Sequence, residues 1–107
     1  MPNPQRGEVE IIINGIPHTL CLTLGALAEL EQAFASDSLI DILERFQTGK
    51  VRARDLILIL KAGLRGGGQQ ASEEDVAEMK FEGGLENTVG IVAELLNATF
   101  ASQSNAQ

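Results

Sequence analysis

"EVEIIINGIPHTLCLT", residues 8–23, places two runs rich in β-branched residues on either side of an Asn-Gly pair. Asn14 and Gly15 both tolerate the positive φ that a type I′ turn requires, so the stretch predicts a β-hairpin. Alternation along the two strands sorts their side chains into two faces. On the first strand Val9, Ile11 and Ile13 share one side and Glu8 and Glu10 take the other. On the second strand Leu20 and Leu22 point one way, with Thr19, Cys21 and Thr23 opposite.

Two helices are predicted directly after the hairpin. Thr23 is a suitable N-cap for the first, whose apolar residues recur at helical spacing. Ser36 or Asp37 is the expected N-cap of the second, which Gly49 ends. The apolar residues of the first helix are Leu24, Leu27, Leu30 and Phe34; those of the second are Leu39, Ile42, Leu43 and Phe46, with Asp41, Glu44 and Arg45 turned to water.

The run "ARDLILILKAGLR", residues 53–65, contains five consecutive apolar residues, and periodicity alone does not separate helix from strand here. Its length from Arg54 to Arg65 favours a helix. Ile57 and Leu58 lie outside the main apolar face, so they either widen the core contact or face a partner. The residues of that main face are Leu56, Ile59, Leu60, Gly63 and Leu64.

The remaining sequence predicts a short helix and a long one. Ser72 is the expected N-cap of the short helix, with Asp75 in a weak capping box, and the helix is expected to end near Gly83. The long helix has two apolar stripes, which predicts cover on both sides. One stripe is Leu85, Val89, Val92, Leu96 and Phe100, and the other is Ile91, Leu95 and Ala98.

The predicted fold class is α+β, an N-terminal β-hairpin followed by a mainly helical bundle of four to five α-helices. One domain is expected over residues 1–107, because a chain of this length has room for one core. The hairpin is placed at about 8–23, the helices at about 24–101, and a frayed polar tail at 102–107.

Composition and charge argue against several classes of partner. The net charge of −7 opposes phosphate backbones and anionic membranes, so we expect no nucleic acid and no membrane. Five of the eight basic residues fall within 50–65, and seven acids fall within 73–94. This asymmetry suits intramolecular pairing or head-to-tail contact between copies of the chain, and two solvated helix faces explain it equally well.

None of the candidate active-site motifs in the sequence meets the requirements of its class. His18 and Cys21 are three residues apart on a strand, so they project from opposite faces and cannot form a nucleophile–base pair. The glycines of "GLRGGGQQASEED", residues 63–75, lack the Gly-Lys-Ser/Thr order of a phosphate loop, and the acids behind them repel a phosphate. Those acids also lack the ligand order of a calcium loop. We therefore predict no enzyme, no cofactor and no metal.

The cellular compartment is predicted from what the sequence lacks. The single cysteine, Cys21, excludes an internal disulfide and fits a reducing compartment. No apolar run approaches the roughly 18 residues that span a bilayer. The first ten residues lack the apolar stretch of a secretory signal. These features predict a cytoplasmic protein.

Three segments resemble the small tail proteins of gene transfer agents, which are phage-like particles, and of related prophages. They are "RGEVEIIINGIPHTLCLTLGALAELEQAF" (6–34), "LIDILERFQTGKVRARDLILILKAGLRGGG" (39–68) and "LLNATF" (95–100). Within them "LTLGALAELE" and "AGLRGGG" are the most distinctive. Members of that family are described as tail tube components or as tail assembly chaperones.

The resemblance implies a non-enzymatic role in building a phage-type tail inside the bacterial host cell. A tail assembly chaperone binds the long helical tape-measure protein and gives way to tail tube subunits as these polymerise. The implied partners are the tape-measure protein, the tail tube subunit and further copies of this chain. The alternative is a structural tail subunit that is retained in the particle.

A chaperone for a helical client needs apolar surface beyond that of its own core. The candidate partner-binding residues are Ile57, Leu58, Ile91 and Leu95, and the alternative is that each completes the core or a contact between copies. Gly66, Gly67 and Gly68 are predicted to act as a hinge that lets the later helices swing.

Overall fold

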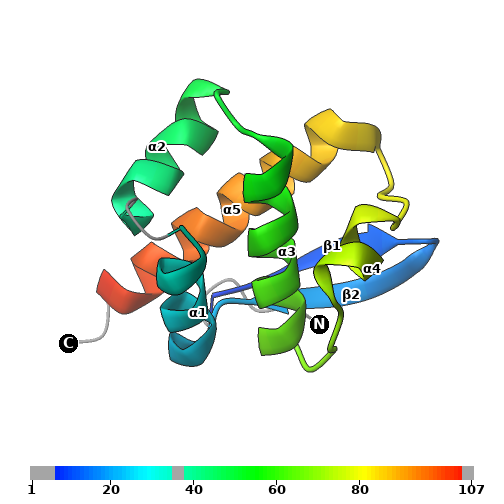
Figure 1. Ribbon diagram of the computed structural model, residues 1–107, viewed down its shortest axis with the longest axis horizontal. Coiled ribbons are helices and arrows are strands. Elements are labelled where there is room, and N and C mark those ends of the chain that lie inside the picture. The colour runs from blue at the N-terminus through cyan, green and yellow to red at the C-terminus, as the bar shows by residue number, and fades with distance from the viewer. Residues whose placement is uncertain (1–6, 35–37, 105–107) are drawn as a thin grey trace.

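The chain folds as a β-hairpin followed by helices, and a computed structural model describes residues 7–34 and 38–104 (Figure 1). The strands are β1 (Glu8–Ile13) and β2 (Ile16–Cys21). The helices are α1 (Leu24–Phe34), α2 (Leu39–Thr48), α3 (Ala53–Gly66), α4 (Glu73–Ala77) and α5 (Gly84–Ser104). The predicted α+β class, mainly helical after the hairpin, is confirmed.

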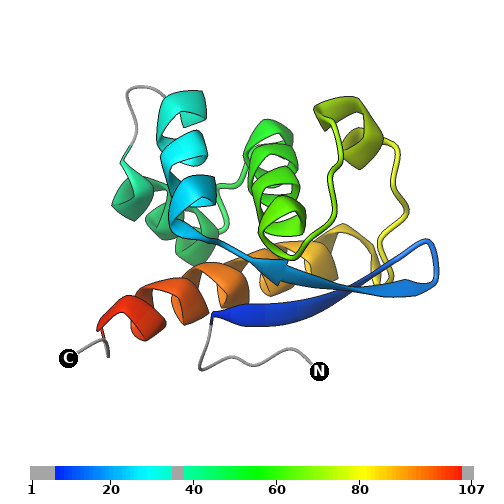
Figure 2. The same cartoon turned by 90° about the horizontal axis from the view of Figure 1, so that it is seen from below.

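The core lies between two layers. Figure 2 shows the hairpin and α5 along one side of the molecule and α1 to α4 along the other. α3 packs against β2, α1, α4 and α5, while α5 also packs against β1 and α2. Ile59, Leu60 and Leu64 of α3 are buried. The long apolar run is therefore a helix, as its length predicts, and its central place lets it bury apolar residues on several sides.

The hairpin forms as predicted. Asn14 and Gly15 have φ values of 53° and 80°, which suit the type I′ turn, and antiparallel pairing starts with Ile13 opposite Ile16. The predicted apolar side of each strand is buried, and the members are Val9, Ile11, Ile13, Leu20 and Leu22.

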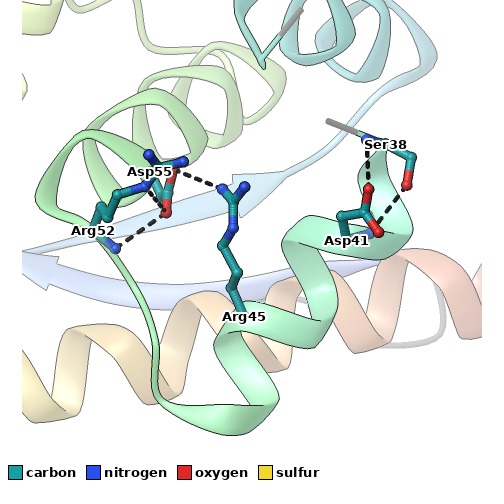
Figure 3. A network of polar contacts seen from close by, with 5 residues as sticks. All are labelled: Ser38, Asp41, Arg45, Arg52 and Asp55. Carbon is teal, nitrogen blue, oxygen red and sulfur yellow. Dashed lines mark hydrogen bonds and ion pairs between the residues drawn. The ribbon is translucent and has the colours of Figure 1, made fainter. Parts of the chain in front are cut away.

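Side chains cap the first two helices. Thr23 Oγ1 caps α1 as predicted, because it accepts a 3.1 Å hydrogen bond from a backbone amide three residues on. The predicted caps of α2, Ser36 and Asp37, lie outside the described residues, and the N-cap is Ser38. Ser38 and Asp41 exchange hydrogen bonds in a capping box (Figure 3). Of the three polar residues in a row, Ser38 alone has an acid three positions later to close the box.

α4 is shorter than predicted. It begins at the expected N-cap, Ser72, and Asp75 completes the capping box. It ends at Ala77, however, so the predicted end near Gly83 was wrong. The difference arises because the residues that follow bond to the hairpin instead of continuing the helix.

The segment after α4 pairs with the tip of the hairpin. Asn14 N donates to Lys80 O at 2.8 Å, and Lys80 N donates to Asn14 Oδ1 at 3.1 Å. Glu82 N donates to Ile12 O at 3.1 Å, and Phe81 forms an isolated antiparallel bridge to β1. The hairpin thus satisfies backbone groups that a longer helix would have satisfied internally.

α5 buries mainly one face, which combines members of both predicted stripes. The buried residues are Thr88, Val92, Leu95, Leu96 and Thr99. Thr88 Oγ1 donates to Gly84 O and Thr99 Oγ1 donates to Leu95 O, so these hydroxyls find acceptors within the helix. Leu85 was expected in a buried stripe and is 70% exposed, because it lies at the edge of a groove.

The C-terminal part of α5 extends further than predicted. The helix continues to Ser104, three residues past the approximate end expected at 101, and fraying of the tail stays a prediction. No Gly or Pro occurs between residues 91 and 104 to end the helix earlier. The last part of the predicted tail, 105–107, lies outside the described residues.

Candidate functional site

An open apolar groove of about 240 Å³ lies between α3 on one side and α4 with the start of α5 on the other. It is smaller than the roughly 300–1,000 Å³ of most small-molecule pockets, so it suits side chains inserted by a protein partner. The lining residues are Ala53, Leu56, Ile57 and Leu60 of α3, Val76 and Ala77 of α4, Met79 and Phe81 of the following segment, and Leu85 and Thr88 of α5.

Four large apolar side chains remain partly accessible in this groove. Leu85 is 70% exposed, and Ile57, Met79 and Phe81 are half-buried where they pack on the core. A single exposed apolar side chain is ordinary on a protein surface. Several that meet in one hollow are typical of a surface that binds another protein.

Asp55 holds the first turn of α3, which forms one wall of the groove (Figure 3). It is 1% exposed, and its Oδ2 accepts a 3.1 Å hydrogen bond from Arg52 N at the start of the helix. Its carboxylate also lies 3.4 Å from Arg45 Nη1 and 3.6 Å from Arg52 Nε. These contacts fix the turn that carries Ala53 and Leu56.

Arg45 was predicted to face water, and that prediction was wrong. Its side chain is 23% exposed and pairs with the buried carboxylate of Asp55, ten residues later in the chain. A buried carboxylate needs an opposite charge or hydrogen-bond donors. The periodicity of α2 could not reveal this pair, because the partner lies on another helix.

The four predicted partner-binding residues lie in two kinds of place. Leu58 and Leu95 are 5% and 0% exposed, so a partner could reach them only after the helices separate. Ile57 and Ile91 are half-buried, and Ile57 lines the groove. Partner binding by these residues stays a prediction, and Ile57 is the residue among them that lies at the apolar groove.

The three predicted hinge glycines have different surroundings. A Cβ atom on Gly66 would overlap the carbonyl oxygen of Cys21, and one on Gly67 would overlap that of Thr19. The end of α3 therefore lies against the backbone of β2 with no room for a side chain. Gly68 has a φ of 100° and no atom within 4 Å of a built Cβ. The hinge stays a prediction, and Gly68 is the position among the three where an added Cβ would meet open space.

Exposed residues of both charges adjoin the lining residues of the groove in the sequence. Glu78, Lys80 and Glu82 lie in or beside the segment after α4, and Arg54 lies on α3, three residues before Ile57. None of these charged residues lines the groove itself, and Glu78 lines a separate hollow with Asn14 and Glu74.

Asp75, in the first turn of α4, has a lowered pKa. The backbone amide of Ser72, and then its side chain, hydrogen-bond the carboxylate and hold the pKa of Asp75 below its ordinary value of 3.8. Hydrogen bonds of this kind favour the charged form of a carboxyl group. The negative charge also interacts favourably with the N-terminal end of the helix.

A comparison with protein families matches residues 6–102 to the family described as phage tail tube protein, GTA-gp10. The chain belongs to this family. The match confirms the resemblance to the small tail proteins of gene transfer agents and phages. Comparisons with curated proteins and with solved structures gave no match.

Three further features of this phage tail protein concern metal-ligand groups, helix hydropathy and the positions of His18 and Cys21. Within residues 7–34 and 38–104, no group of three His, Cys, Asp or Glu side chains is placed to hold a metal ion. No helix in the same ranges has the length and apolar character needed to cross a bilayer. His18 and Cys21 occupy β2 positions of opposite parity, and so lie on opposite faces of the strand.

Three residues that line the groove of the tail protein were not predicted as site residues from the sequence. Met79 and Phe81 fall within the short helix that was predicted to reach Gly83, and Leu85 falls within a predicted buried stripe. The alternating pattern of Met79, Lys80 and Phe81 is a strand signal, but three residues are too few to outweigh a helix start. Their meeting depends on the path of the chain after α4.

Proposed function

We propose that this chain is a tail assembly chaperone of a phage-like particle, a gene transfer agent or prophage, which binds the tape-measure protein during tail morphogenesis. The role is non-enzymatic and depends on protein–protein contacts. The observation that carries the proposal is the small, two-stranded β-sheet, whose edges are covered in part.

The sheet has two strands of six residues each. The outer edge of β2 lies against Gly66 and Gly67 of the α3 end, and β1 near its tip bonds to the segment around Phe81. Subunits that join by extending a β-sheet need open strand edges. Because the edge of β2 is covered at Thr19 and Cys21 and the edge of β1 is covered near Ile12, these positions are closed to strand addition, which supports a chaperone over a tube subunit that adds strands to its neighbours.

The surface properties of the chain also support a chaperone. The apolar groove beside Ile57 and Leu85 offers contact area that the core does not use. The net charge of −7 helps to keep a protein with such a surface soluble. A helical client can lay its own apolar face into a groove of this kind.

A structural tail subunit retained in the particle is the second candidate, because the matched family is described as a tail tube protein. In that case neighbouring copies would meet mainly through helix faces, since most residues of the described elements are helical. The groove would then be covered inside the assembled tail.

Co-expression with the tape-measure protein of the same tail tests the proposal. We expect a soluble complex, and we expect the chain to be missing from purified particles when these are analysed by quantitative mass spectrometry. A stoichiometric number of copies in the particle would favour the structural subunit and contradict the chaperone.

A further inference from the structure

Residues 72–82 form a distinct segment between α3 and α5, and we call this segment the strap. It contains α4 with its N-cap and the residues that follow α4 as far as Glu82. Figure 2 shows one loop that leads from α3 into α4 and another that leads from α4 to α5. The strap supplies several of the side chains that line the apolar groove, and these are Val76, Ala77, Met79 and Phe81.

Glycines join both ends of the strap to the rest of the fold. Gly68 has a φ of 100° and no atom within 4 Å of a built Cβ, and the exposed Gln69 and Gln70 follow it. At the other end Gly83 and Gly84 have φ values of 83° and 77°. Glycine adopts both signs of φ at little cost, and hinges are a few residues that absorb such rotations. Both ends of the strap are therefore able to act as joints.

One side chain supplies most of the burial of α4. Val76 is 1% exposed, and the main packing partner of α4 is α3. The remaining residues of this helix are exposed, and these are Glu73, Glu74, Asp75 and Ala77. A helix of five residues is too short to be stable by itself. Segments with few buried apolar contacts open locally at a smaller free energy than global unfolding requires.

Hydrogen bonds at the surface fasten the second half of the strap. Lys80 exchanges two hydrogen bonds with Asn14 at the tip of the hairpin, and Glu82 N donates to Ile12 O. Asn87 Nδ2 of α5 donates to Glu82 O at 2.9 Å. The polar residues of these bonds are exposed, so water can replace each bond when it breaks. Such bonds hold the strap closed without making its release as costly as that of a buried segment.

The groove side chains of α3 depend on the strap for cover. Leu56 and Leu60 are 6% and 2% exposed, and they line the groove together with Val76. Met79 and Phe81 are half-buried at the same groove. Movement of the strap away from α3 would remove these apolar neighbours from Leu56 and Leu60. The apolar surface available to a partner would then be larger than in the closed form.

α5 does not share the freedom of the strap. Its residues Val92, Leu95 and Leu96 are 0% exposed. The helix packs against β1, α2 and α3, and so it is held from several sides. A swing of all helices after the glycines of α3 would have to separate these contacts. Movement at low cost is therefore confined to residues 72–82.

We propose that the strap opens as a unit about Gly68 at one end and about Gly83 and Gly84 at the other, while the rest of the chain stays folded. Opening uncovers Leu56 and Leu60 of the groove. The closed form keeps this apolar surface covered, and the open form offers it to a partner. The inference goes beyond the proposed function, because opening is a property of the chain alone and requires no client.

Amide hydrogen exchange of the unmodified chain, followed by NMR, tests whether the strap is one unit. The amides of Val76, Lys80 and Glu82 are each hydrogen-bonded in the closed form. We expect them to share one opening equilibrium constant, about tenfold or more above that of the amides of Leu95 and Leu96 in α5. Protection of the strap equal to that of α5 would contradict a separate opening.

Thiol labelling at two buried valines measures the same opening at side chains. Val76→Cys places a thiol on the strap, and Val92→Cys places one on α5 at a site that is buried to the same degree. Mass spectrometry of proteolytic peptides separates each introduced thiol from the native Cys21. We expect the thiol of Val76→Cys to react about tenfold or more faster than that of Val92→Cys. Circular dichroism checks that both variants keep the fold.

Two further substitutions test the fastenings of the strap. Asn14→Gly removes the side-chain bond to Lys80 N and keeps the turn, because glycine suits the positive φ of a type I′ turn. Asn87→Ala removes the bond to Glu82 O, and alanine suits a helix. Asn97→Ala is the matched control, because Asn97 is an exposed asparagine on the same helix.

The fastening variants are measured through the two introduced thiols. Asn14→Gly and Asn87→Ala are each expected to raise the labelling rate of Val76→Cys by about fivefold, which corresponds to the loss of one hydrogen bond. Neither should raise the labelling rate of Val92→Cys to the same extent. Asn97→Ala should leave both rates unchanged.

Two results would overturn the inference. Equal labelling rates for Val76→Cys and Val92→Cys would show that α4 separates only when the whole chain unfolds. Fast labelling of Val76→Cys that neither Asn14→Gly nor Asn87→Ala alters would show that α4 opens without the rest of the strap. If Val76→Cys does not fold, the hydrogen exchange of the unmodified chain decides between a separate opening and global unfolding.

Discussion

The two ends of α3 are held in place by different means. We call the end with Gly63, Gly66 and Gly67 the packed end, and the first turns from Ala53 to Ile57 the groove end. At the packed end the helix lies against the backbone of β2 so closely that a Cβ on Gly66 or Gly67 would overlap a carbonyl oxygen. At the groove end charged contacts through a buried carboxylate hold the helix, and its apolar side chains line an open groove.

α5 also packs closely beside the packed end of α3 and leaves a side chain exposed beside the groove end. A Cβ built on Gly63 would lie 3.2 Å from Leu95 Cδ2 and 3.3 Å from Leu20 Cδ2, so small size at this position lets α5 and β2 both approach α3. Ten residues earlier in α5, Leu85 is 70% exposed beside the groove end. One end of α3 is thus closely packed, and at the other end apolar side chains stay partly accessible in the groove.

The largest expected effect comes from a charge placed at the packed end. Leu95→Asp leaves a cavity and buries a carboxylate, and we expect it to lower the free energy of unfolding by more than about 4 kcal/mol. Leu85→Asp, at the groove end, should change it by no more than about 0.5 kcal/mol. Urea unfolding followed by circular dichroism measures both. Similar losses in the two variants would show that the two ends are packed alike.

The next effect concerns the glycines. Gly67→Ala forces a Cβ into the carbonyl oxygen of Thr19, and we expect it to lower the free energy of unfolding by about 3 kcal/mol. Gly68→Ala meets no such contact, but its φ of 100° disfavours a side chain, so about 1 kcal/mol is expected. If the glycines act as a hinge, both variants should lose similar amounts of unfolding free energy and both should bind the client less tightly. If close contact with Thr19 is what matters, Gly67→Ala should lose clearly more unfolding free energy than Gly68→Ala.

A smaller loss of unfolding free energy is expected when the hydrogen bond and ion pairs of Asp55 at the groove end are removed. Asp55→Ala removes the hydrogen bond to Arg52 N and the partner of Arg45, and should lower the free energy of unfolding by about 2 kcal/mol. Both arginines reach water, so the loss stays below that of a fully buried ion pair. Asp41→Ala, which removes one arm of an exposed capping box, serves as the comparison at about 0.5–1 kcal/mol. Equal losses would show that burial adds nothing to the contacts of Asp55.

The smallest effect is a dependence on pH at α4, beside the groove end. Because the folded-state pKa of Asp75 is lowered, its contribution to stability is present above the ordinary value of 3.8 and is lost as the pH falls through the folded-state pKa. The difference in unfolding free energy between wild type and Asp75→Asn should therefore shrink over that range. NMR titration of the carboxyl carbon gives the folded-state pKa directly. A pKa at or above 3.8 would contradict the capping contacts.

Local patterns predicted the parts of the fold that neighbouring residues control. The Asn14-Gly15 turn, the alternation of the hairpin and the cap at Thr23 each involve groups within a few residues of one another. The family resemblance also belongs to the sequence, and the match over residues 6–102 confirms it. The turn, the alternation and the cap are contained in short stretches of chain, and the family match needs only the order of residues along the chain, so none of them requires a tertiary contact.

The candidate site could be predicted only in part. Ile57 was singled out because it lies outside the main stripe of its helix, and it does line the groove. Leu58 was singled out on the same ground and is 5% exposed, because neighbouring elements cover α3 on more sides than its main stripe indicates. A helical pattern ranks positions by their angle around one helix, and it cannot say how many sides of that helix are covered.

The hairpin and the membership of a tail protein family follow from the sequence, and the length of the central apolar run favours a helix. Three contacts depend on the tertiary structure: Arg45 reaches Asp55, Phe81 joins the hairpin, and Gly66 and Gly67 lie against β2. The physical reason is the separation along the chain between the groups that interact. Turns, caps and alternation depend on covalent neighbours, whereas a groove, a buried ion pair and a backbone contact depend on which distant segments the whole fold brings together.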